Sequence, residues 1–332
     1  MAARLRARRL ALGAVAGAAA LLGLWGAAVY QGSATALAAR KGELQAVEAS
    51  PRGQDPVSTF EELTLRSSTA AEIHALIRVP RAGGSRMPAA VLMGGIKRGR
   101  RIVTAPGLEE IARQAVVVSA DYPLKLDRRA FRGLTALDTF RRLRPAALDS
   151  VVEVMLLLDY LERRPDVDAS RLFLVGGSLG APVVTVAGAV DPRPAAVIVL
   201  YGGGALGSLI THTLEHPAQD RPYPPWAAWL AGRGLAWLFT PLEPARYAPR
   251  IAPRRFLMVN GRGDSLIPAA NVAALYDAAR DPKELIWMEG EHIQPEETAL
   301  IGQVGGTVAT WLHARGLLPD EGAASGGRAA RP

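Results

Sequence analysis

The stretch that most constrains this chain runs from Arg171 to Pro182 and reads RLFLVGGSLGAP. Its four apolar residues from Leu172 to Val175 predict a short buried strand. The sequence GGSLG then interrupts the strand, and from Ala181 onward the residues predict a helix. The stretch therefore predicts a strand, a sharp turn and a helix, with Ser178 at the apex of the turn.

Small residues flank Ser178 for a steric reason. A serine at the tip of such a turn has a strained backbone, and Gly176 and Gly180 allow the strand and the helix to approach closely. The strain exposes the hydroxyl group, and the backbone amide of Leu179 then points to where an oxyanion would form. This GxSxG pattern resembles the nucleophile elbow of the α/β-hydrolase family. The resemblance implies an α/β fold with a mainly parallel central sheet flanked by helices, in which a serine, an acid and a histidine follow one another along the chain.

Composition limits the other classes of function. A chain of 332 residues with 49% hydrophobic content can form one large core. The formal net charge of +8 is concentrated at the amino terminus, where the first 40 residues hold five arginines and no acid. We therefore predict no nucleic-acid partner. The chain has no cysteine and no HExxH sequence, so we expect no disulfide, no metal and no cofactor.

The amino terminus resembles a membrane anchor. Four arginines lie within residues 1–9, and Leu10 to Tyr30 contains no charged residue, which is long enough to cross a bilayer as a helix. We predict a basic cytoplasmic flank at 1–9, a transmembrane signal anchor at 10–30, and a catalytic domain outside the cytoplasm, periplasmic or extracellular. Small residues at 36–39 leave open the alternative of a cleaved signal and a secreted protein.

The rest of the chain divides into a linker at 31–55, an α/β-hydrolase domain at 56–316 and a disordered tail at 317–332. The first two predicted strands, Phe60–Arg66 and Ile73–Val79, alternate apolar and polar residues and predict an antiparallel pair at the sheet edge. Apolar runs and helical patterns then alternate, which predicts a mainly parallel sheet. The further predicted strands are Ala89–Met93, Ala115–Ala120, Ala195–Tyr201, Pro253–Asn260 and Glu284–Met288, and the predicted helices are Gly107–Gln114, Ala146–Arg163, Ala269–Arg280 and Glu296–Arg315.

A long segment at 202–250 interrupts this alternation and predicts a small cap insertion. It is rich in aromatic residues, including Trp226, Trp229 and Trp237. Three interpretations remain open: the aromatic side chains pack the cap onto the body, these three tryptophans line the substrate pocket, or the cap touches the membrane.

A serine nucleophile needs a histidine base, and the base needs a carboxylate. His292 follows the last predicted strand and so lies at the carboxyl edge of the sheet, where the active sites of parallel-sheet proteins are usually found. The other histidines after Ser178 lie in the cap, at His212 and His216, or in the last helix, at His313. We therefore predict that His292 is the base.

Asp264 is the predicted acid. It lies in a glycine-rich loop directly after a predicted strand, and a proline that opens the next helix follows it, as in the family that the chain resembles. Asp191 and Asp220 are weaker candidates, because one follows the elbow helix and the other lies in the cap. The same loop spells GDSL, the name of another esterase family, which makes Ser265 an alternative nucleophile that we do not favour.

The second oxyanion donor should come from the loop after the strand Ala89–Met93. Family members often carry His-Gly there, whereas this chain has the sequence GGIK. The two glycines still permit close backbone approach, so the amide of Gly95 or that of Ile96 is the expected second donor beside Leu179.

The resemblance is strongest to dienelactone hydrolase and prolyl-oligopeptidase-type catalytic domains and their small esterases. It implies a serine esterase that cleaves a small-molecule ester through an acyl-enzyme on Ser178, with His292 and Asp264 completing the triad. Two alternatives use the same scaffold: an acyl-CoA thioesterase or acyltransferase, and a catalytically dead, membrane-tethered binding protein.

Overall fold

The computed structural model of the chain describes residues 17, 19–20, 22–69, 72–81, 86–95, 98–124, 133–216 and 223–319. Nine strands of these residues form one sheet in the order β1-β2-β3-β5-β4-β6-β7-β8-β9. The strands are β1 (Leu44–Gln54), β2 (Ser58–Ser67), β3 (Glu72–Pro80), β4 (Met87–Met93), β5 (Val116–Ala120), β6 (Val167–Gly177), β7 (Ala196–Leu200), β8 (Arg255–Gly261) and β9 (Lys283–Met288).

Strands β4 to β9 pair in parallel, whereas β1, β2 and β3 pair antiparallel with their neighbours. Every residue of β4 and β5 is buried, as expected for short apolar runs covered on both faces. The prediction of a mainly parallel sheet is therefore confirmed, and the carboxyl ends of β4, β6, β7, β8 and β9 meet at one edge.

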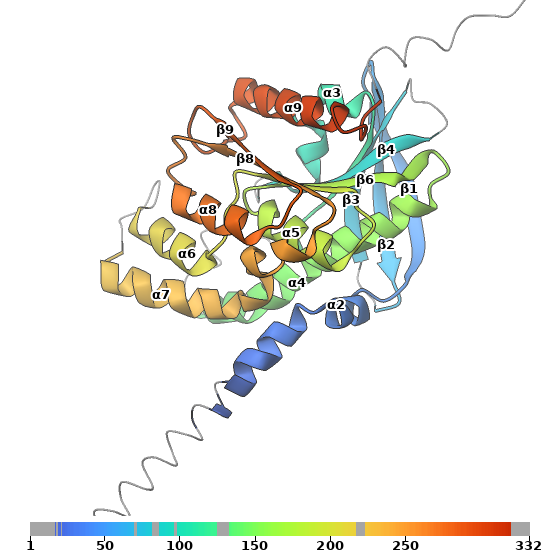
Figure 1. Cartoon of the computed structure of the whole chain (residues 1–332). Helices are drawn as coiled ribbons and strands as arrows, with labels where there is room; N and C mark the ends of the chain where they lie inside the picture. The colour runs from blue at the N-terminus through green and yellow to red at the C-terminus, as the bar shows by residue number, and fades with distance from the viewer. Residues whose placement is uncertain are drawn as a thin grey trace, which may run out of the picture.

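Helices cover both faces of the sheet (Figure 1). The short α3 (Glu109–Ala112) and α9 (Thr298–His313) lie on one face. The other face carries α2 (Ala34–Lys41), α4 (Gly133–Arg163), α5 (Gly180–Val190) and α8 (Ala269–Ala278). The two faces hold separate apolar clusters, so the sheet is buried between two layers of helices.

The cap segment at 202–250 forms a helical hairpin beside α8 (Figure 1). Its helices are α6 (Leu206–Glu215) and α7 (Pro225–Leu238), followed by the 3₁₀ helices η2 (Thr240–Leu242), η3 (Pro244–Arg246) and η4 (Ala248–Arg250). A further 3₁₀ helix, η1 (Gly99–Thr104), lies between β4 and α3.

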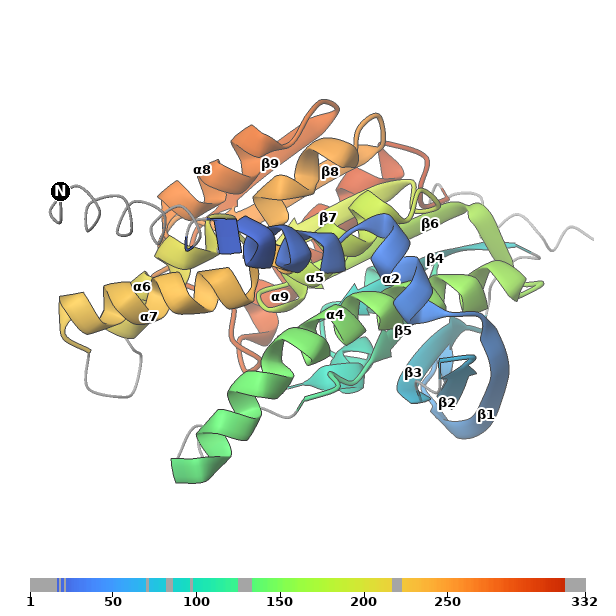
Figure 2. The same cartoon turned by 90° about the horizontal axis from the view of Figure 1, so that it is seen from below.

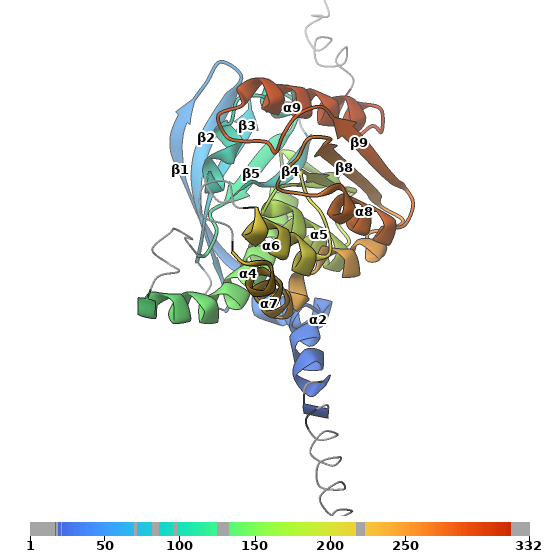
Figure 3. The same ribbon diagram turned by 90° about the vertical axis from the view of Figure 1, so that its left-hand side faces the viewer.

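The segment 31–55, predicted to be a linker, is instead part of the folded domain. It forms α2, which lies beside α4 (Figure 2), and β1, which pairs with β2 along most of its length. Leu37 of α2 is fully buried, and Arg40 forms a 2.6 Å ion pair with Asp149 of α4. The domain therefore begins before residue 56, and β2 and β3 are interior strands, since β1 occupies the sheet edge (Figure 3).

Three predicted bounds also differ. Helix α3 is shorter than the predicted 107–114, and α4 begins at Gly133 rather than at residue 146, because it continues through Pro145. At the carboxyl end, Leu317 and Leu318 are buried in the cluster beneath α9, so the predicted tail begins later than residue 317. Its remainder from residue 320 lies outside the described residues.

Residues 22–31 are helical and project away from the body of the protein (Figure 3). Leu22, Leu24 and Trp25 in this helix are exposed. Within the described ranges, no helix is both long and apolar enough to span a bilayer. The first part of the predicted anchor, residues 10–16, lies outside the described residues, so the anchor stays a prediction.

Helix α4 carries an unpaired acid on its buried side. Glu153 is 7% exposed, and its Oε2 has no hydrogen-bond partner among the described residues. Burial raises the pKa of Glu153 well above its usual value, and the negative charges of Asp149 and Asp121 raise it further. The folded protein therefore holds a proton on Glu153 that the unfolded chain releases at a lower pH.

Replacing Glu153 with glutamine is expected to stabilise the protein at alkaline pH. Between the unfolded and the folded pKa of Glu153, the folded state binds one proton more, so stability falls by about 1.4 kcal/mol per pH unit. Glutamine does not titrate, so it adds no such pH dependence to the stability. Thermal unfolding should show a larger gain in Tm for Glu153→Gln at pH 8 than at pH 5, whereas equal gains at both values would contradict the buried, neutral acid.

Candidate active site

The elbow at the end of β6 has the strained geometry that its sequence predicts. Ser178 has a φ of 51°, a conformation that non-glycine residues seldom adopt. A Cβ on Gly176 would collide with Val184, and one on Gly180 would collide with the carbonyl oxygen of Met93. Glycine at both positions thus allows α5 to begin directly against β4 and β6, which presents the Ser178 hydroxyl at the sheet edge.

The structure brings the three predicted triad residues together. The Nε2 atom of His292 lies 3.0 Å from the Oγ atom of Ser178, and its Nδ1 atom lies 2.8 Å from the Oδ2 atom of Asp264. The side chains of His292 and Asp264 are 7% and 1% exposed. One ring nitrogen therefore faces the hydroxyl and the other faces a carboxylate shielded from water, which is the arrangement that a general base requires.

Asp264 also organises its own loop. Its Oδ1 atom accepts hydrogen bonds of 2.9 Å from the backbone amides of Leu266 and Ile267. Asp264 therefore has two roles. Its Oδ1 atom caps the turn, as aspartates commonly do, and its Oδ2 atom contacts His292. These bonds fix the carboxylate, which in turn orients the imidazole ring.

The aromatic ring of Tyr201 packs beside the imidazole ring of His292. Its ring meets that of His292 edge to face, with centroids 5.6 Å apart. Burial raises the pKa of Tyr201 to about 12, with a further contribution from the charge of Asp264. A neutral aromatic wall thus packs against the imidazole.

Two backbone amides are free to bind an oxyanion. No hydrogen bond among the described residues uses the amide of Leu179 or that of Gly95. Gly95 also lines the pocket that contains Ser178, and Arg98 donates its backbone amide to the Gly95 carbonyl over 3.3 Å. The other predicted donor, Ile96, lies outside the described residues.

Tyr122 supports the loop that carries Gly95, and sequence reasoning missed it. Tyr122 is the second residue after β5, and its hydroxyl donates a hydrogen bond to the carbonyl of Gly94. Burial raises the pKa of Tyr122, so its hydroxyl stays protonated and able to donate. Its position at the carboxyl end of a parallel strand was the available signal.

Replacing Tyr122 with phenylalanine is expected to lower kcat roughly three- to tenfold and to leave KM within about twofold. The lost hydrogen bond is worth about 1 kcal/mol, and a loosened oxyanion loop matters most in the transition state. Ester-hydrolysis kinetics measure the effect. The matched control is Tyr160→Phe, which removes a hydroxyl contact with Arg164 on α4, away from the site, and should leave kcat unchanged; equal losses in both variants would contradict the positioning role.

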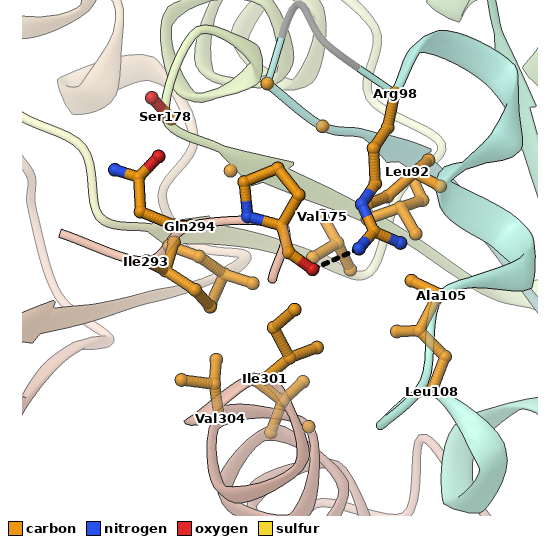
Figure 4. A pocket seen from close by; sticks show the side chains of 18 of the residues that line it. Leu92, Arg98, Ala105, Leu108, Val175, Ser178, Ile293, Gln294, Ile301 and Val304 are labelled. Carbon is orange, nitrogen blue, oxygen red and sulfur yellow. Dashed lines mark hydrogen bonds between the residues drawn. The ribbon is translucent and has the colours of Figure 1, made fainter. Parts of the chain in front are cut away.

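A pocket of about 770 Å³ opens beside Ser178 and His292. It lies on the face of the sheet that α3 and α9 cover, and its lining includes residues of β4, β6 and α9. Arg98 crosses one side of the pocket and donates to the carbonyl of Pro295, which ties η1 to the loop that carries His292 (Figure 4). Sequence reasoning found neither the pocket nor Arg98.

The cap tryptophans lie elsewhere, which counts against one of the three interpretations left open by the sequence, namely that they line the substrate pocket. Trp226, Trp229 and Trp237 are 73%, 55% and 45% exposed, and none of them belongs to the pocket lining. Helix α7 packs against α6 through its small residues Ala228 and Gly232. The ring of Trp237 packs against the guanidinium group of Arg144 on α4, 4.8 Å from the ring centroid, so this tryptophan joins the cap to the body.

Among the described residues, the alternative candidates for nucleophile, acid and base form no hydrogen bond with Ser178. Ser265 is exposed, and its carbonyl contacts His212 of the cap over 2.9 Å. Asp191 forms an ion pair with Arg193, and His313 contacts Gln114. Asp220 lies outside the described residues.

Comparisons with known proteins agree with this architecture. Residues 195–304 match the serine hydrolase family FSH1. A segment of 138 residues, 41% of this chain, is 27% identical to the uncharacterized protein YfhR of Escherichia coli O157:H7 and to its counterpart in strain K12. The match covers 43% of the length of those relatives.

Several solved structures have the same fold. Acetyl xylan esterase 1 from Thermoanaerobacterium sp. JW/SL YS485 aligns with a TM-score of 0.59 at 18% identity, over 87% of this chain and 92% of that one. An acetyl xylan esterase from Paenibacillus sp. R4 aligns with a TM-score of 0.58 at 18% identity, over 82% and 92%. The methylesterase BT1017 aligns with a TM-score of 0.58 at 19% identity, over 90% of this chain and 64% of its own.

Proposed function

We propose that the chain is an α/β-hydrolase of the serine-esterase type and that it hydrolyses carboxylic esters through an acyl-enzyme on Ser178. One observation carries the proposal: a strained serine, a histidine and a buried aspartate are hydrogen-bonded in series at the carboxyl edge of the sheet. The family match and the esterase neighbours support the same reaction class.

Acylation begins when the Oγ atom of Ser178 attacks the ester carbonyl carbon and its proton moves to Nε2 of His292. The carboxylate of Asp264 stabilises the resulting imidazolium. The amides of Leu179 and Gly95 donate to the oxyanion, and each such donor contributes about 3 kcal/mol of barrier lowering in comparable sites. The tetrahedral intermediate then collapses, and the alcohol leaves with the proton from His292.

Deacylation repeats these steps with water. His292 accepts a proton from a water molecule as the water oxygen attacks the acyl carbonyl carbon. The second tetrahedral intermediate collapses, the carboxylic acid leaves, and the proton returns to the Oγ atom of Ser178.

Hydrolysis of p-nitrophenyl esters by the purified chain tests this function. A serine esterase should release p-nitrophenol from at least one ester in an acetate-to-decanoate series, with an initial burst when deacylation is the slower step. Absence of turnover across the whole series by a folded protein would favour the catalytically dead binding scaffold instead.

We further propose that the amino-terminal segment at 10–30 anchors the catalytic domain in a membrane and that this domain lies outside the cytoplasm. Exposed Leu22 and Leu24 on the projecting helix support this location, because exposed apolar side chains suit a lipid environment. Expression followed by carbonate extraction of membranes tests it. An anchored chain stays in the pellet at full length, whereas a soluble product that begins near residue 40 would mean a cleaved signal.

A further inference from the structure

The pocket beside Ser178 continues as a channel between the sheet and helix α9. Its floor is made of residues that alternate along two neighbouring strands, Ala90 and Leu92 on β4 and Phe173 and Val175 on β6. These residues pair across the ladder, Ala90 with Phe173 and Leu92 with Val175, so their side chains form a continuous surface on one face. The floor is wholly apolar and leads away from the elbow.

Helix α9 forms the roof of the channel. Ile301, Val304, Gly305 and Val308 line it, at the i, i+3, i+4 and i+7 spacing of a single helix face. A Cβ on Gly305 would collide with the carbonyl oxygen of Gly107, so this glycine allows the loop at Gly107 to pack directly against α9. On the floor, the short side chain of Ala90 leaves space between the sheet and the helix.

The two ends of this channel differ in polarity. Figure 4 shows Ser178 and Gln294 toward one end, the guanidinium group of Arg98 midway along the pocket, and Leu108, Ile301 and Val304 toward the other end. The floor on β4 and β6 and the roof on α9 present only apolar side chains to a substrate, whereas the polar side chains of the lining are those of Arg98, Ser178, His292, Gln294 and Glu296. Such a channel favours a hydrocarbon chain over a sugar or a peptide.

Resting on the proposed esterase function, we infer that this channel holds the acyl part of the substrate and that the preferred substrates are esters of medium-chain aliphatic acids. The acyl group stays bound to Ser178 while the alcohol leaves, so a channel with its polar opening at Ser178 suits the acyl group. An alcohol held there would have to leave past the acyl-enzyme.

The length of the channel sets the expected chain length. Ser178 directly follows β6 and lies five residues after Phe173, which corresponds to about 16 Å at roughly 3.3 Å per residue. A carbon–carbon bond of about 1.5 Å advances an extended chain by roughly 1.25 Å, so this length holds at most roughly thirteen carbons. Acyl chains of roughly eight to twelve carbons therefore fill most of the channel, and much longer ones do not fit inside it.

A chain-length series on the full-length protein tests the inference. With p-nitrophenyl esters kept below their micelle-forming concentration, kcat/KM should rise up to about fourfold per methylene from acetate and reach its maximum between roughly eight and twelve carbons. A series of acetate esters with lengthening alcohols should show no comparable rise. A maximum at acetate, or a rise with alcohol length alone, would overturn the acyl channel while leaving the esterase function intact.

Substitutions in the roof give a second test. Val304→Phe should lower kcat/KM for the decanoate ester at least tenfold and change that for the acetate ester less than twofold, because it blocks the channel without touching the triad. The control is Thr310→Phe, on the exposed side of the same helix, which should change neither. Equal losses on both esters for Val304→Phe, with a native circular dichroism spectrum, would contradict the inference.

Val304→Ala tests the same roof position with a smaller side chain, so the test does not depend on whether Val304→Phe folds. It removes two methyl groups from the roof and should move the optimum toward longer acyl chains. An unchanged optimum in this variant would also count against the acyl channel.

Discussion

Ser178→Ala is expected to lower kcat for ester hydrolysis at least about 10³-fold. The substitution removes the atom that forms the acyl-enzyme, and in comparable triads loss of the serine eliminates almost all of the rate beyond what the oxyanion hole alone supplies. Alanine is smaller than serine and keeps the elbow backbone, so the fold should be unaffected. The measurement is steady-state hydrolysis of a p-nitrophenyl ester.

The matched control for Ser178→Ala is Ser265→Ala, the serine of the GDSL sequence. Ser265 is exposed and lies outside the hydrogen-bonded series of Ser178, His292 and Asp264, so its removal should change kcat less than twofold. If Ser178→Ala kept a tenth or more of the activity, or if Ser265→Ala lost it, the assignment of the nucleophile would be wrong.

Asp264→Asn is expected to lower kcat by about 10⁴-fold near neutral pH. An asparagine keeps an oxygen for the amides of Leu266 and Ile267, so the loop should retain its shape. Its amide group, however, would face Nδ1 of His292 as a donor and favour the tautomer with the proton on Nε2, which cannot accept the proton of Ser178.

The control for Asp264→Asn is Asp191→Asn. Asp191 is 4% exposed and pairs with Arg193, so its loss should reduce stability without changing the kcat of the folded protein beyond about twofold. A combined Ser178→Ala, Asp264→Asn variant should be no slower than Ser178→Ala alone, because the two residues act as a unit. Full activity of Asp264→Asn would remove Asp264 from the triad.

The elbow and the order of the site residues could be predicted from the sequence because local sterics fix them. Gly176 is required by contact with Val184 in the helix that follows it, and Gly180 by contact with Met93 of the neighbouring β4. Asp264 and His292 follow strands whose apolar runs are easily recognised. In a parallel sheet the carboxyl ends of those strands meet, so predicting the strands also placed the side chains near one another.

Strand β1 could not be predicted because its residues carry almost no pattern. Of its eleven residues only Leu44 is buried, and the strand contains Pro51 and Gly53. Backbone hydrogen bonds to β2 hold it in the sheet, and such bonds leave little trace in side-chain type. The sequence therefore resembled a linker.

The channel was also beyond sequence reasoning, for a different physical reason. Val304, Val308 and Phe173 have the periodicity of core residues, and they are buried as core residues are. Whether facing side chains fill the space between two layers depends on volumes summed across elements far apart in the chain, such as those that carry Ala90 and Val304. The cap tryptophans are a second example, since they lie outside the pocket. The aromatic content of the cap does not show which face of α7 is covered by the rest of the protein.

Labelling with a fluorophosphonate followed by peptide mass spectrometry tests the central claim most directly. The claim is that His292 and Asp264 activate Ser178 as a nucleophile. We expect one phosphonylated serine per chain, on the peptide that contains Ser178, and strongly slowed labelling in His292→Ala and Asp264→Asn. Absence of an adduct on the folded wild-type protein, or an adduct on Ser265 instead, would contradict the account.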